Sequence, residues 1–177
     1  MRRIYLIGII ICFASCASVH VKYDYDTKAD FSSYRTYNYF RNMDTGMSDL
    51  DTGRLVFAMD SLLQQKGIRQ SEEPEFLINI QSQTFLKPSN SSVGVGVGGT
   101  GGNVGGGVSI GVPVGGDTME RELVFDFVDS QKNQLYWQAL CRTSAIDNAS
   151  PETRRKKIID LVAKVLEKYP PELSGNE

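Results

Sequence analysis

Histidine and cysteine are scarce in this sequence of 177 residues, and there is no excess of positive charge. The single histidine, His20, excludes a histidine-rich metal site and leaves any histidine-based catalytic triad dependent on one residue. A formal net charge of −2 provides no basic surface that would attract nucleic acid. We therefore expect a protein without a metal site, a cofactor or a nucleic-acid partner.

The apolar run at the N-terminus, residues 4–13, is too short to cross a bilayer as a helix, which needs about 20 residues. It follows two arginines and is typical of the apolar region of a secretory signal peptide. Small residues then lead directly into Cys16, and this ending resembles a bacterial lipobox in which Phe13 replaces the usual leucine.

The lipobox resemblance implies that residues 1–15 form a lipoprotein signal peptide and that Cys16 receives diacylglycerol and further acyl chains such as palmitate. Residues 16–18 would form a short tether to the membrane. Alanine, not aspartate, follows the cysteine, which by analogy with enteric bacteria favours the outer membrane. The domain could face the periplasm or the cell exterior, and we expect the periplasm. A secreted protein cleaved near Ala17 and an uncleaved anchor are the alternatives.

Loss of the leader and lipidation of Cys16 would leave Cys141 as the one free thiol. The mature chain could then form no intrachain disulfide, so its stability would come from packing. Cys141 lies in an alternating segment with Leu135, Trp137 and Ala139, and we expect these four side chains to share the core face of a strand.

Apolar periodicity predicts the secondary structure of the remaining chain. A period of two indicates strands, whereas a stripe at helical spacing indicates a helix. Ser48 or Asp49 can cap the first helix, Gly67 can end it, and Ser150 with Pro151 can begin the second. We expect strands at 19–26, 34–40, 74–85, 121–130 and 135–145, and helices at 48–66 and from 150 to the prolines at 170 and 171.

The resulting order is ββα-β-(glycine-rich insert)-ββα, which predicts an α+β fold. We expect a two-layer sandwich in which two helices cover one face of a mostly antiparallel sheet. Residues 19–171 would form one domain, followed by a polar tail at 172–177. Its early tyrosines could form an aromatic binding surface or cross-strand pairs within the sheet; they are Tyr23, Tyr25, Tyr34, Tyr37 and Tyr39.

The insert at residues 91–116 contains a G-x-G-x-x-G pattern, but it does not predict a nucleotide site. Twelve of the 17 glycines fall between residues 94 and 116, so the pattern is expected by chance. A dinucleotide site also needs a helix directly after the glycines, and here further glycines and Pro113 follow.

Two alternatives remain for this insert. Its glycine content favours a flexible loop, because glycine costs the most backbone entropy to order. Its alternating β-branched residues favour a hairpin, with one apolar face that could contact a partner, another copy or lipid. The residues of this possible interaction arm are Val93, Val95, Val97, Val108, Ile110, Val112 and Val114.

Several stretches in order resemble the DUF4136 family of bacterial envelope lipoproteins, whose biochemical role is not established. The most distinctive are D-F-S-x-Y-x-T-Y at 30–37 and V-D-x-x-x-x-x-L-Y-W at 128–137. The resemblance extends over most of residues 19–171 and implies a compact two-layer α/β domain. It supplies no catalytic residues.

The sequence therefore favours a non-enzymatic, membrane-anchored envelope lipoprotein that binds or scaffolds another envelope component. The anchor, the lack of a recognisable catalytic set and the uncharged insert are the basis of this hypothesis. The alternative is a small-ligand carrier or an enzyme that uses a pocket between the sheet and the helices.

Overall fold

The computed structural model describes residues 19–87, 92–95, 110–113, 118–146 and 148–172. Its elements in chain order are β1 (His20–Tyr25), η1 (Phe31–Ser33), β2 (Thr36–Tyr39), α1 (Asp49–Gln65), β3 (Arg69–Gln70), β4 (Phe76–Lys87), β5 (Ser92–Val95), β6 (Ile110–Pro113), β7 (Thr118–Asp129), β8 (Gln134–Ser144), α2 (Pro151–Val165) and η2 (Leu166–Lys168).

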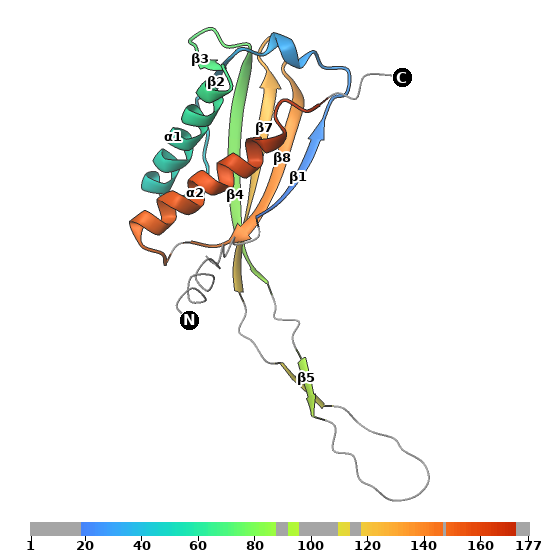
Figure 1. Ribbon diagram of the computed structural model, residues 1–177, viewed down its shortest axis with the longest axis vertical. Helices are drawn as coiled ribbons and strands as arrows, with labels where there is room; N and C mark the ends of the chain where they lie inside the picture. Colours follow the sequence, from blue (N-terminus) through green and yellow to red (C-terminus); the bar gives the residue numbers. More distant parts are fainter. Residues whose placement is uncertain (1–18, 88–91, 96–109, 114–117, 147, 173–177) are drawn as a thin grey trace, which may run out of the picture.

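The main sheet has six strands in the order β1-β8-β7-β4-β2-β3 (Figure 1). Most neighbours are antiparallel, whereas β2 runs parallel to both β3 and β4. Strands β4 and β7 pair over their whole length, and their last pair, Lys87 with Thr118, lies beyond the other strands. We call this the lower end of the sheet, where β1 also begins, and the opposite end, where β4 begins at Phe76, the upper end.

Both helices lie side by side over one face of this sheet (Figure 1). The core between the layers follows the period-two alternation of the strands, since alternate side chains of β4 from Phe76 to Ile80 and of β7 from Leu123 to Asp129 are buried there. The fully buried side chains of the sheet include Phe76, Ile78, Ile80, Leu123, Phe125, Phe127 and Trp137, and those of the helices include Leu55, Met59, Leu63, Val162 and Val165.

The helix boundaries lie where the sequence predicts them. The Ser48 hydroxyl accepts a hydrogen bond from the backbone N–H of Asp51, and that of Ser150 accepts one from Thr153. Gly67 follows the first helix with φ +81°, a conformation that favours glycine. Local sequence thus sets where each helix starts and where the first one stops.

One predicted side-chain position is wrong. A bulge separates the pair Phe127–Trp137 from the pair Val128–Leu135, so Tyr136 is the extra residue of β8. Tyr136 and Trp137 are therefore both buried, while Leu135 is turned out and is 50% exposed. Cys141 is buried, as the alternation predicts.

The structure confirms the α+β class, the two-layer architecture and the mostly antiparallel sheet with two helices on one face. The short parallel strand β3 was not predicted. Its two exposed residues have no apolar alternation that would indicate a strand.

Candidate functional site

Cys16, the predicted lipidation site, lies outside the described residues. The same holds for Val97, Val108 and Val114 of the possible interaction arm. Within the described ranges, no helix has the length and apolar character needed to span a membrane.

The other four residues of the possible arm lie in two short paired strands. Strands β5 and β6 form a separate antiparallel sheet, in which Val93 is opposite Val112 and Val95 is opposite Ile110. Of the two alternatives for the insert, these segments adopt the hairpin pairing. Figure 1 shows them beyond the lower end of the main sheet.

Three of the early tyrosines, Tyr23, Tyr37 and Tyr39, link the sheet to the helices by hydrogen bonds. The hydroxyl groups of Tyr37 and Tyr39 both donate to one carboxylate oxygen of Asp60 on α1, each at 2.7 Å. The Tyr23 hydroxyl donates to the carbonyl oxygen of Lys164 on α2 at 2.6 Å. Burial, and then the contacts with Asp60, raise the pKa of Tyr37 and Tyr39, so both remain neutral donors at physiological pH.

Tyr34 belongs to the core at the upper end. Its ring stacks on that of Tyr136 with 3.9 Å between centroids, and its hydroxyl donates to Asp129 at 2.9 Å. Burial, together with Asp129, raises the pKa of Tyr34 to about 12. The Tyr136 and Tyr169 hydroxyl groups are hydrogen-bonded to one another at 2.7 Å, so the hydroxyl groups of Tyr34, Tyr136 and Tyr169 all have partners within the domain.

Between the sheet and the helices, the described residues enclose a small cavity. Among the described residues, the cavity found there holds about 20 Å³ and is lined by Leu55, Leu123, Ile158 and Leu161 together with several polar neighbours. That volume accommodates about one water molecule, whereas ligand pockets measure about 300–1,000 Å³.

Two side chains with reactive potential are the buried Cys141 and the exposed His20. Burial raises the pKa of the Cys141 thiol to about 12, so the nucleophilic thiolate is disfavoured at neutral pH. His20 is exposed at the first position of β1. No group of three histidine, cysteine or acidic side chains within the described ranges could hold a metal ion.

The opposite face of the sheet carries a broad open depression of about 760 Å³ near the upper end. It faces away from the helices, because its residues on β4 and β7 alternate with the buried core residues. We call it the open-face depression; the strand residues that line it include Asn38, Leu77, Asn79, Asp126, Val128 and Leu135.

The open-face depression combines one apolar row with one polar row. Strand pairing places Leu77 opposite Val128, and Val128 opposite Leu135. The next row places Asn79 beside Asp126, which accepts a hydrogen bond from the Gln138 side chain at 2.7 Å. A surface of this kind can bind a chain that offers both apolar side chains and hydrogen-bonding groups. Sequence reasoning missed it because it depends on which strands are neighbours.

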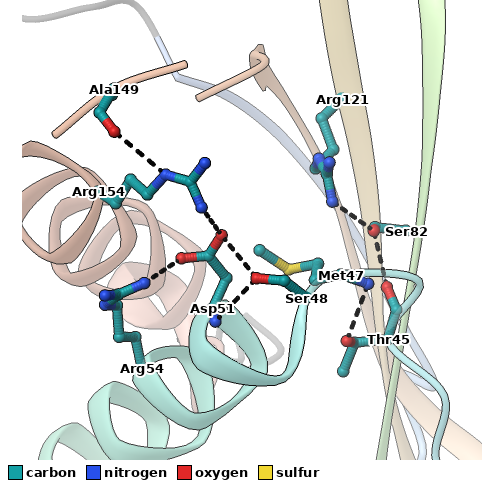
Figure 2. A network of polar contacts seen from close by, with 9 residues as sticks. All are labelled: Thr45, Met47, Ser48, Asp51, Arg54, Ser82, Arg121, Ala149 and Arg154. Atoms are coloured by element: carbon teal, nitrogen blue, oxygen red, sulfur yellow. Dashed lines mark hydrogen bonds and ion pairs between the residues drawn. The ribbon is translucent and has the colours of Figure 1, made fainter. Parts of the chain in front are cut away.

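A buried polar network joins the starts of the two helices near the lower end (Figure 2). Asp51 is 2% exposed and binds Arg54 of its own helix at 2.5 Å and Arg154 of α2 at 2.7 Å. The Ser48 hydroxyl also donates to Asp51, while Arg154 donates to the carbonyl oxygen of Ala149. The S-x-x-D capping-box spacing is the sequence signal that could have identified Asp51. The network is structural, since its carboxylate is enclosed by its own partners.

A second set of contacts in Figure 2 fixes the loop before α1 against β4. The Ser82 hydroxyl donates to the carbonyl oxygen of Thr45 at 2.7 Å and accepts from Arg121 at 3.4 Å. Gly46 has φ +64°, and a Cβ atom there would lie 2.6 Å from the carbonyl oxygen of Ser82. Only glycine fits this close approach.

A family model described as a domain of unknown function, DUF4136, matches residues 21–171. The match covers the whole main sheet except the first residue of β1, together with both helices. None of the curated proteins matches this chain in sequence.

Two solved structures are similar to this chain at low sequence identity. A PDZ domain protein from Parabacteroides distasonis is 14% identical, with a TM-score of 0.54 over 87% of this chain, and the chain spans 36% of that protein's length. The PelC dodecamer from Paraburkholderia phytofirmans is 11% identical, with a TM-score of 0.48, and the match covers 90% of this chain and 100% of that one. The first of these likenesses bears on the fold alone.

Proposed function

This chain belongs to the DUF4136 family, and from that premise we propose that it is a lipid-anchored envelope protein whose domain binds another envelope protein without catalysing a reaction. The anchor is Cys16, and the membrane is the outer membrane, with the domain on its periplasmic side. The binding surface is the open-face depression. The family itself is defined by a domain of unknown function, so the proposal rests on the residues of this chain.

One observation supports the binding role: one face of the sheet is covered by the helices, whereas the opposite face is open. The helices and a closely packed aromatic core occupy one face. The other retains a depression of about 760 Å³, in which Leu77 and Val128 are only half-buried. An apolar row beside an amide-rich row on a rigid sheet favours a polypeptide partner.

Two further observations support a role without catalysis. Carboxylates with shifted pKa values take part in structural contacts. Backbone N–H groups of Arg35 and Thr36 lower the pKa of Glu75, and the hydrogen bond from Arg142 lowers the pKa of Glu122. Asp126 in the depression is bound by Gln138. The pKa values of Glu75 and Glu122 are lowered, whereas a general acid or base near neutral pH needs a pKa raised toward 7.

A photo-crosslinking amino acid at Asn79 tests the binding surface in living cells. We expect this position, in the depression, to crosslink to one envelope protein. The matched control is Gln64, an exposed residue of α1 on the helix side of the molecule. Crosslinking of the same partner from Gln64 but not from Asn79 would place the binding surface elsewhere and contradict the proposal.

Metabolic labelling with palmitate tests the anchor separately. We expect the label in the wild-type chain and its loss in Cys16→Ala, because the acylated residue is removed. The matched control is Cys141→Ala, which removes the buried thiol and should keep the label. Label that persists in Cys16→Ala would refute the assignment.

A further inference from the structure

The start of β1, the end of β4 and the start of β7 all lie at the lower end of the molecule (Figure 1). His20 is opposite Arg142, Arg142 is opposite Glu122, and Glu122 is opposite Gln83. Whatever precedes β1 therefore leaves the domain at the lower end, at the level of Gln83.

The chain between Cys16 and His20 limits how far a lipid on Cys16 can lie from the last β4–β7 pairs. Cys16 precedes His20 by four residues, which span at most about 13 Å at the rise of an extended chain. Leu86 follows Gln83 by three residues within β4, or about 10 Å in the same direction. A bilayer that holds a lipid on Cys16 thus lies within reach of Leu86.

This end also carries large apolar side chains that the domain leaves uncovered. Leu86 is 62% exposed, and its partner across the strands, Met119, is 53% exposed. By alternation, both lie on the helix side of the sheet but beyond the helices. Leu50, in the first turn of α1, is 73% exposed near the same end. The uncharged stretch that follows Lys87 begins here too.

Basic residues lie at the same end of the molecule as these apolar groups. Helix α2 begins at the lower end, because it follows the end of β8 (Figure 1). Arg155 and Lys156, in its first turns, are exposed, whereas Arg154 is held by Asp51. Exposed acidic residues at the helix starts are Asp49 and Glu152. Exposed apolar groups flanked by basic ones are typical of surfaces that contact anionic lipid.

We propose that the lower end of the domain is a lipid-contacting surface, in which Leu86 and Met119 enter the apolar boundary of the bilayer and Arg155 and Lys156 meet anionic headgroups. The proposal rests on the lipid anchor at Cys16 proposed above. It sets the orientation of the domain: the strands stand away from the membrane, and the open-face depression, near the upper end, is held away from the lipid surface.

The test uses the purified, lipidated protein in vesicles of phosphatidylethanolamine and phosphatidylglycerol. Leu86→Cys and Met119→Cys are each labelled with an environment-sensitive fluorophore, while native Cys141 is buried and protected. Leu135→Cys is the matched control, an equally exposed apolar residue at the upper end. We expect a blue-shifted emission and quenching by a lipid-soluble nitroxide at positions 86 and 119, and neither at 135.

Fluorophores at 86 and 119 that remain in water on vesicle-bound protein would overturn the lipid-contacting surface and leave the anchor intact. A blue shift in dilute detergent that grows with protein concentration would indicate a second copy at this surface and would also overturn the proposal. Protein that carries no acyl chain and does not float with vesicles would overturn both the anchor and this surface, so the two failures are distinguishable.

Discussion

The upper and lower ends of the space between the sheet and the helices are closed by different kinds of side chain. At the upper end, rings close the gap: Phe76 lies 5.1 Å from Phe127 and 5.8 Å from Tyr136 between centroids. At the lower end, β4 changes from Ile80 to Ser82 on its core side, and hydrogen bonds to the loop at Thr45 take over.

This difference shows that the two ends of one sheet have separate structural roles. Buried apolar surface stabilises a fold without regard to direction, so the aromatic end holds the two layers together without setting where the helices begin. Hydrogen bonds and ion pairs are directional, so the polar end sets where the helices begin. The aromatic contacts that stabilise the domain thus lie far from the proposed membrane surface. The polar contacts that set the helix starts lie close to it.

The largest expected effect comes from breaking the aromatic end. Phe76→Ala removes a fully buried ring that contacts several others, and we expect the free energy of unfolding to fall by about 3–5 kcal/mol. Urea denaturation followed by the fluorescence of Trp137 measures this change. Leu135→Ala, at the same end but exposed, is the control and should change the value by less than about 0.5 kcal/mol. Equal losses in the two variants would contradict the comparison.

A smaller effect should follow from breaking the polar end. Asp51→Asn leaves Arg54 and Arg154 without their shared carboxylate, and we expect a loss of about 2–3 kcal/mol, less than for a fully buried ion pair. Amide hydrogen exchange should speed up in the first turns of both helices and stay slow in β7 and β8. Asp49→Asn, in the same turn but exposed, provides the control. Faster exchange spread evenly over the sheet would contradict a local role.

The smallest expected effect is on the pH dependence of stability and concerns Tyr34 at the aromatic end. Burial first, and then Asp129, raise the pKa of Tyr34 from 10.0 to about 12, so the folded state favours its neutral form. This stability is fully present below pH 10 and is lost as pH rises through about 12. Tyr34→Phe loses the hydrogen bond to Asp129, or about 1 kcal/mol at neutral pH.

The free energy of unfolding should then fall less steeply at alkaline pH in Tyr34→Phe than in the wild type. Other buried tyrosines should retain part of this pH dependence. Unfolding free energies measured from pH 8 to pH 12 give the two slopes. Parallel slopes would show that Tyr34 contributes nothing to alkaline unfolding.

Much of the fold was predictable because its signals are local. Ser48 and Ser150 cap the helices, and Leu123, Phe125 and Phe127 alternate into the core, since capping and period-two patterns depend on residues a few positions apart. The bulge at Tyr136 was missed because it depends on the partner strand. The tyrosines were left undecided for the same reason: Asp60, which binds two of them, lies more than 20 residues away along the chain.

The sequence by itself determined the α+β class, the element order, the helix caps and the burial of Cys141, because each depends on short-range pattern and chain entropy. Only the tertiary structure decided that Asn79 and Asp126 share an open face, that Asp51 joins two helices, and that Leu86 and Met119 emerge at the end where β1 begins. Each of these features brings distant segments of the chain together. Strand order and register produce them, and no local pattern encodes either.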